Sequence, residues 1–145
     1  MRHAILEKYY LPYRHKVHTL VTESILRHKK VLHLSIHSFT PILEGEVRNC
    51  DVGLLYDPAR IVEKSICQTL AEGMKATSKL TLRMNYPYHG TSDGLVTTLR
   101  KAFSEEQYAG IEIELNQKLL IGYRDEVVAP LKFALERIYS DKTST

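Results

Sequence analysis

The chain has 145 residues, enough for one hydrophobic core, and we expect a single α/β domain over residues 1–145. Hydrophobic residues make up 43% of the sequence, which excludes disorder as the dominant state. The 20 Lys and Arg residues are balanced by 17 Asp and Glu and form no long run, so nucleic acid is not an expected partner. No apolar stretch approaches the roughly 20 residues that cross a bilayer, and no signal-peptide pattern opens the chain. We therefore expect a cytoplasmic protein with no membrane partner.

The first two predicted elements are a helix over residues 13–30 and a strand over residues 31–39. Val17, Val21 and Ile25 recur at the spacing of one helix face. The next nine residues alternate strictly between apolar and polar side chains, as one strand of a half-buried sheet does. This strand therefore has an apolar face and a polar face.

The second predicted helix has marked ends. Asp57 and Pro58 are typical of an N-cap and a first helical position, and Gly73 is typical of a left-handed C-cap. Apolar periodicity and turn residues predict the rest of the chain in the same way. These further elements are a strand over 80–84, a loop over 85–94, a short helix over 95–103, a strand over 108–115 and a helix over 127–139.

Alternation of helices and strands is typical of a layered α/β domain with a mostly parallel sheet. Ligands of such sheets bind beyond the carboxyl ends of the strands. The chain has two strand ends rich in polar side chains, at residues 37–41 and 112–117. We expect a functional site there.

Glu112 and Glu114 share one face of the second of these strands. If the strand lies at an edge, the face is solvated; if it is central, the carboxylates need a cation or another partner. Their spacing does not decide between the two. His33 and His37 lie four residues apart, about 13 Å along a strand, so they cannot share one metal ion without a bend.

Two other kinds of chemistry receive little support from the sequence. Cys50 and Cys67 fit neither a CxxC pair nor a disulfide framework, and we expect reduced thiols. No GxSxG motif accompanies any serine, which disfavours a serine triad. The loop over residues 83–94 combines Pro and Gly with polar donors, and it is either a site for an acidic ligand or an ordinary structured loop.

Four segments in order carry a resemblance to a known family. They are HSFTP at 37–41, RNCDVGLLYD at 48–57, NYPYHGTSDG at 85–94 and GIEIELNQ at 110–117. Together they resemble the N-formylglutamate amidohydrolase family over roughly residues 9 to 120. The resemblance implies a three-layer α/β/α fold of the phosphorylase/hydrolase-like kind, shared with zinc carboxypeptidases, with a mostly parallel or mixed sheet.

The resemblance also implies catalytic roles. His37 matches the last zinc ligand of that wider group, and Glu114 matches its general base, with Glu112 as a supporting or competing candidate. The implied reaction is zinc-assisted hydrolysis of a small acidic amide, in which N-formyl-glutamate gives formate and glutamate.

An acidic substrate needs a cation for its carboxylates. Arg48 is the first candidate and Arg83 the second. Asn85 and Tyr88 would orient the substrate.

One departure from the family bears on the metal. Family members carry, upstream of the matched region, a further strand and loop with the first metal ligands, so we expect a fold truncated at its N-terminal side and zinc binding that is weak or absent in this chain. A homo-oligomer or a complementing N-terminal segment would supply the missing ligands. The alternative is a noncatalytic α/β domain that acts as an interaction or small-acid-binding module.

Overall fold

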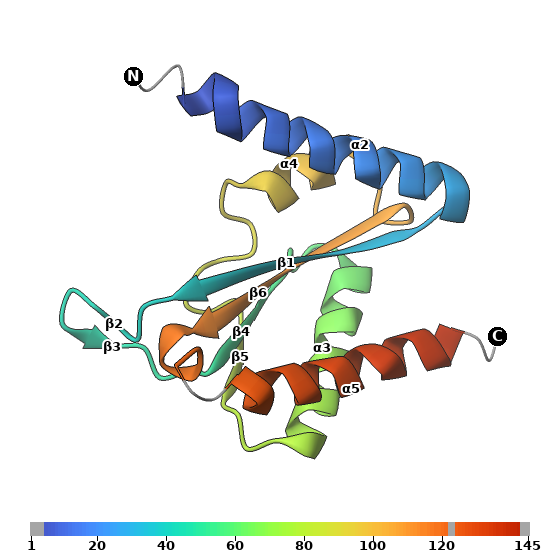
Figure 1. The fold of residues 1–145 in the computed structure, drawn as a ribbon. Helices are drawn as coiled ribbons and strands as arrows, with labels where there is room; N and C mark the ends of the chain where they lie inside the picture. Colours follow the sequence, from blue (N-terminus) through green and yellow to red (C-terminus); the bar gives the residue numbers. More distant parts are fainter. Residues whose placement is uncertain (1–4, 122–123, 143–145) are drawn as a thin grey trace.

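A four-stranded mixed sheet forms the centre of the fold (Figure 1). The computed structural model describes residues 5–121 and 124–142, so the ends of the predicted domain lie outside the described residues. The strand order is β1 (Val31–Phe39), β6 (Tyr108–Asn116), β4 (Val52–Leu55) and β5 (Leu82–Met84). The outer pairs are parallel and the central pair β6–β4 is antiparallel, which makes the sheet mixed.

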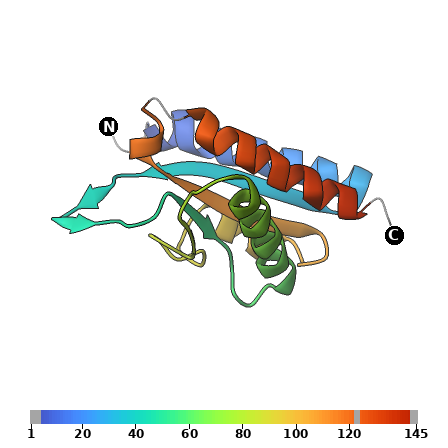
Figure 2. The ribbon, with the colours of Figure 1, turned by 90° about the horizontal axis from the view of Figure 1, so that it is seen from below.

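Helices cover both faces of this sheet, as Figures 1 and 2 show. On one face lie α2 (Leu11–His28) and α4 (Leu95–Ala102), and on the other α3 (Ile61–Thr77) and α5 (Arg124–Lys142). The expected three-layer α/β/α architecture is therefore confirmed. The remaining elements are the π-helical turn η1 (Leu6–Tyr10), the hairpin strands β2 (Ile42–Leu43) and β3 (Glu46–Val47), and the 3-10 turn η2 (Gln117–Leu119).

The predicted ends of the second helix are wrong for two local reasons. Asp57 does not cap the helix; its Oδ1 accepts a hydrogen bond from the Ala59 N–H at 2.9 Å, and the helix begins at Ile61. Gly73 lies inside the helix, where a Cβ would come within 2.8 Å of Ala134 on α5. That glycine serves close helix packing, and the helix continues to Thr77.

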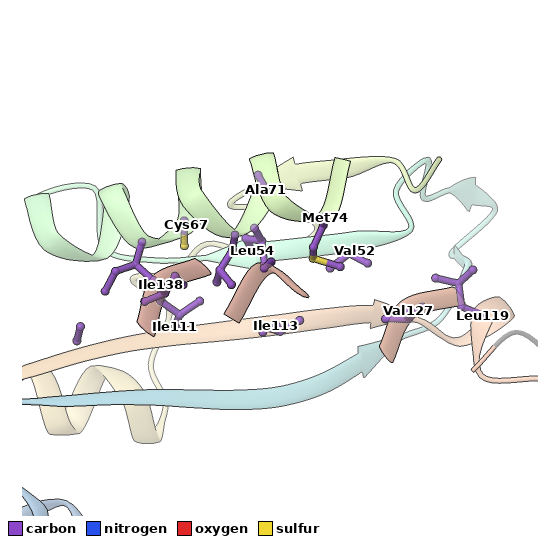
Figure 3. Packing of buried hydrophobic residues seen from close by; sticks show 14 residues of the cluster. Val52, Leu54, Cys67, Ala71, Met74, Ile111, Ile113, Leu119, Val127 and Ile138 are labelled. Carbon is purple, nitrogen blue, oxygen red and sulfur yellow. The ribbon is translucent and has the colours of Figure 1, made fainter. Parts of the chain in front are cut away.

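The main hydrophobic core lies between the sheet and the α3–α5 pair (Figure 3). A smaller cluster of Val21, Leu99 and Tyr108 lies under α2 and α4. Both cysteines are free, as expected; both are also buried, and burial raises the pKa of the Cys67 thiol to about 12. In the described part of the chain, no helix is both long and apolar enough to cross a membrane.

Candidate active site

The two predicted strand ends meet side by side in the sheet. In the parallel register of β1 and β6, His37 is the partner of Glu114, and Ser35 is the partner of Glu112. Residues two apart on a strand share a face, so all four side chains start from one face of the sheet. Because β6 lies between β1 and β4, its acidic pair belongs to an internal strand and not to a solvated edge.

His37 is the accessible member of this group. Its side chain is 51% exposed, and its Nε2 lies 3.9 Å from Oε2 of Glu112. The same nitrogen shares a hydrogen bond of 2.9 Å with the Ser35 hydroxyl. The imidazole is therefore oriented from both strands while part of it still faces solvent.

Glu114 is the buried member. Its Oε2 has no hydrogen-bond partner, and only 5% of the residue is exposed. Burial raises the pKa of the Glu114 carboxyl, and the charge of Glu112 adds to that rise, while His37 and Arg48 oppose it. Burial likewise raises the pKa of Glu112, against the opposing effect of His37. A buried carboxylate oxygen without a hydrogen-bond partner is unfavourable. The Oε2 atom of Glu114 is therefore free to accept a hydrogen bond from a bound molecule.

Arg48 follows the β2–β3 hairpin, and its positive charge acts on the Glu114 carboxyl. Its Nη1 donates a 3.1 Å hydrogen bond to the Tyr88 hydroxyl, and its guanidinium lies 5.1 Å from the centre of the Tyr88 ring. On the other side, Phe39 at the end of β1 lies 5.9 Å from the guanidinium. A cleft of about 350 Å³ opens beside Arg48, between the hairpin and the segment Tyr86–Pro87. Two aromatic rings thus hold a cation at the mouth of a cleft.

The other two predicted substrate-binding residues have different surroundings. The Arg83 guanidinium stacks 3.8 Å from the Tyr86 ring, and no described contact links it to His37 or Glu114. The Oδ1 atom of Asn85 accepts hydrogen bonds from the N–H groups of Tyr56 and Gly90, at 3.0 and 3.2 Å. With a φ of 49°, Asn85 adopts the left-handed conformation that asparagine tolerates. Its carbonyl oxygen therefore shapes the loop that carries Tyr88.

Sequence reasoning missed a buried ion pair that holds this loop against the sheet. Arg100 of α4 bonds to Glu63 of α3 through Nε and Nη2, at 3.0 and 2.9 Å. Arg100 also donates to the carbonyl oxygens of Gly90, in the loop, and Gly110, on β6. The pair is 37 residues apart in sequence, and no local pattern links its members.

The donor set can be compared with what a catalytic zinc ion needs. Such a site has three protein ligands and an open position. Among residues 5–121 and 124–142, no group of three or more His, Cys, Asp or Glu side chains is placed to hold a metal ion. His37 lies close to Glu112 and is the register partner of Glu114. These three side chains are nevertheless not arranged as the ligands of one metal ion. The described residues therefore do not fit a complete zinc site.

Three comparisons with known proteins bear on this arrangement. The family model of N-formylglutamate amidohydrolase matches residues 1–121, and the chain belongs to that family. A solved gene product of Agrobacterium tumefaciens matches with a TM-score of 0.74 and 24% identity, over 97% of this chain and 55% of that one. An N-formylglutamate amidohydrolase from Ralstonia eutropha matches with a TM-score of 0.67 and 18% identity, over 92% of this chain and 54% of its own. No curated protein sequence matches.

These matches differ in what they support. The family match covers most of the chain and agrees with the four motifs in the sequence. At their low identities, the two solved structures support the fold alone. The chain spans about half the length of each solved relative it matches.

Proposed function

We propose that this chain carries the base and the carboxylate-binding cation of an amidohydrolase. Its substrate would be N-formyl-glutamate or a related small N-acyl acidic amino acid, cleaved to formate, or the corresponding acid, and the free amino acid. Family membership supports the reaction class. The observation that carries the proposal is the buried, unpartnered Oε2 of Glu114, on the sheet face that also bears His37. A water molecule or an amide N–H would satisfy that oxygen.

Glu114 is the proposed general base. Burial raises the pKa of Glu114 toward neutral pH, and a general base is most efficient when its pKa lies near the working pH. As the water oxygen bonds to the formyl carbon, Glu114 takes one water proton. It then gives this proton to the nitrogen as the C–N bond breaks, so the hydroxyl ends in formate and the proton on the amine. Glu112, beside His37, would orient the imidazole.

Arg48 is the proposed cation for the substrate carboxylates, because its guanidinium lies at a cleft and its charge acts on Glu114. Tyr88 holds that guanidinium through its hydroxyl. Arg83 remains the second candidate cation. The role proposed for Asn85 is to fix the loop around Tyr88, since its oxygen already accepts two backbone hydrogen bonds.

Zinc remains part of the proposal in a limited form. His37 would be one ligand, because its imidazole is exposed and oriented by Ser35. The remaining ligands would come from outside the described residues, since these contain no group of three or more His, Cys, Asp or Glu side chains placed to hold a metal ion.

A second candidate function is a noncatalytic module that binds small acids. The incomplete metal set favours it, because the Arg48 cleft needs no metal to bind a carboxylate. Calorimetry with glutamate tests it: binding that is lost in Arg48→Met, without any formate release, would support this alternative over the hydrolase.

The test of the hydrolase is formate release from N-formyl-glutamate with Zn²⁺ present. Release that is abolished by Glu114→Gln and weakened through KM by Arg48→Met is the expected result. Arg83→Met distinguishes the two candidate cations, because a rise in KM in that variant and not in Arg48→Met would assign the substrate carboxylates to Arg83. Equal rates for the parent chain and Glu114→Gln, or no release from either, would overturn the proposal.

A further inference from the structure

Helix α5 has two apolar stripes, and only one of them is covered. The first contains Val127, Ala134 and Ile138, which are buried in the main core. The second follows a neighbouring face of the helix at steps of three or four residues, and its members are Val128, Leu131, Leu135 and Tyr139. We call these four residues the outer stripe. Because a surface helix of a globular protein has one apolar stripe toward its core, a second stripe indicates a second packing partner.

The outer stripe is open to solvent and is flanked by two opposite charges. Val128 and Tyr139, at its two ends, are 52% and 66% exposed, and the two leucines between them are half-buried. The stripe lines a shallow groove of about 510 Å³ whose walls are mostly apolar. Lys132 and Glu136 complete the lining, and both side chains are largely exposed. The groove therefore combines an apolar surface with one ammonium and one carboxylate group.

This groove is complementary to itself. In an interface with two-fold symmetry, residue i of one copy meets residue j of the other, and residue j meets residue i. Three pairs of groove residues have their midpoints at or between residues 133 and 134: Val128 with Tyr139, Leu131 with Leu135, and Lys132 with Glu136. A two-fold axis through that point brings apolar side chains onto apolar ones and sets each ammonium group beside a carboxylate.

We propose that two copies of this chain associate through α5, with their outer stripes packed antiparallel about a two-fold axis near the middle of the helix. Charge complementarity favours a second copy as the partner, because the two charges of one groove match those of the other across the axis. The helix has 19 residues and is about 28 Å long, so the contact is smaller than a standard protein interface. We therefore expect a weak dimer with a Kd in the micromolar range.

The dimer would leave the candidate active site open. Leu32 and Leu34 of β1 pack against the main core, on the side of the sheet that α5 covers. His37 lies on the opposite face, because side chains of a strand alternate between faces. The inference is therefore independent of the proposed function, and formate release should be the same in variants that dimerise and variants that do not.

Sedimentation equilibrium over a range of protein concentrations tests the dimer. We expect the parent chain to dimerise and Val128→Lys to weaken the dimer at least about tenfold. Arg137→Glu is the control for a change of charge, because Arg137 is exposed on the same helix but does not line the groove. Thermal unfolding of each variant at a concentration below the Kd shows that the monomer still folds.

Two charge reversals test the pairing itself. Lys132→Glu alone sets carboxylates against carboxylates across the axis, and Glu136→Lys alone sets ammonium groups against ammonium groups, so each should dimerise at least about tenfold more weakly. An equal mixture of the two variants restores both contacts between opposite charges and should form a heterodimer about as tight as the parent dimer. The pair formed by Lys132 and Glu136 within one helix cannot explain this rescue, because it stays broken in both variants.

Three outcomes would overturn the inference. They are a parent chain that is monomeric at every concentration, a dimer that Val128→Lys leaves unchanged, and a mixture of the two charge variants that associates no more tightly than either alone. In the first case, sedimentation with phosphatidylglycerol vesicles that Val128→Lys abolishes would assign the outer stripe to a lipid surface. Formate release without a dimer would keep the hydrolase and refute this inference, whereas a dimer without formate release would do the reverse.

Discussion

His37 and Glu114 face each other as register partners across the parallel pair β1–β6. One lies on a strand at the edge of the sheet and is exposed; the other lies on an internal strand and is buried. The pairing places an accessible imidazole beside a carboxylate that is kept from solvent.

Glu114→Gln should make the protein more stable at pH 7. The ionised carboxylate has an oxygen without a hydrogen bond, and burial raises its pKa because the charged form is disfavoured there. Removing the charge should raise the free energy of unfolding by about 1 kcal/mol, or the melting temperature by about 2–4 °C. Thermal unfolding followed by circular dichroism measures this. Glu72→Gln, on an exposed position of α3, should have almost no effect. A lower melting temperature for Glu114→Gln would contradict the prediction.

Gly53→Ala should displace the loop that follows β5. An added Cβ would lie 1.9 Å from the carbonyl oxygen of Tyr86 and 3.3 Å from the Cβ of Glu114. Relief of that clash requires backbone movement, and we expect a loss of about 1–3 kcal/mol in urea unfolding. In Gly94→Ala, the new methyl meets only the Ser92 carbonyl oxygen, at 4.0 Å, so a smaller loss is expected. Equal losses in the two variants would mean that the close approach at Gly53 is relaxed at little cost.

Arg100→Met should be among the most damaging single changes in the chain. It would leave Glu63, which is fully buried, without its closest cation and would free the carbonyl oxygens of Gly90 and Gly110. Breaking a buried pair in this way costs about 3–5 kcal/mol. Urea unfolding of Lys101→Met, at the next and exposed position, is the control and should differ by less than about 0.5 kcal/mol. A comparable stability of the two variants would argue against the ion pair.

Asp51→Asn should lower stability at pH 7 and make it less sensitive to acid. Burial acts to raise the pKa of Asp51, but hydrogen bonds from Lys118 and the Thr81 N–H outweigh it and lower the pKa below 3.8. A carboxyl with a lowered pKa stabilises the fold above its unfolded pKa, and that contribution is lost as pH falls through the folded value. We expect a difference of about 1 kcal/mol at pH 7 that shrinks toward pH 2. Urea unfolding at both pH values measures it, with exposed Asp93→Asn as control; an undiminished difference at pH 2 would refute it.

Strict local patterns predicted their elements well. The alternation over residues 31–39 predicted both ends of β1 correctly, because side chains of a strand point to opposite faces in turn and the alternating pattern stops where the strand stops. Gly73 was misread as a helix end because its reason is a contact with Ala134 on a helix 61 residues later, which a local pattern cannot contain. The four residues of β4 were also missed, since a short, fully buried strand has no alternation.

The site divides in the same way. His37, Glu112, Glu114 and Arg48 were predicted through motifs, and the sheet register brings the first three together. The internal position of β6 was left open by the sequence, because strand order depends on long-range pairing. Arg100 and Glu63 belong to no recognised motif, and they lie 37 residues apart, so no local pattern predicted their pairing. The contacts that shape the loop therefore became visible only in three dimensions.

The internal position of β6 has a consequence for amide hydrogen exchange. Its backbone is bonded to β1 on one side and to β4 on the other, so the amides around Glu114 should open only with the whole fold. Along β1, the amides that point away from β6 should exchange rapidly. The two halves of the site thus belong to regions of different local stability: the imidazole of His37 lies on the faster-exchanging strand and the carboxylate of Glu114 on the slower one.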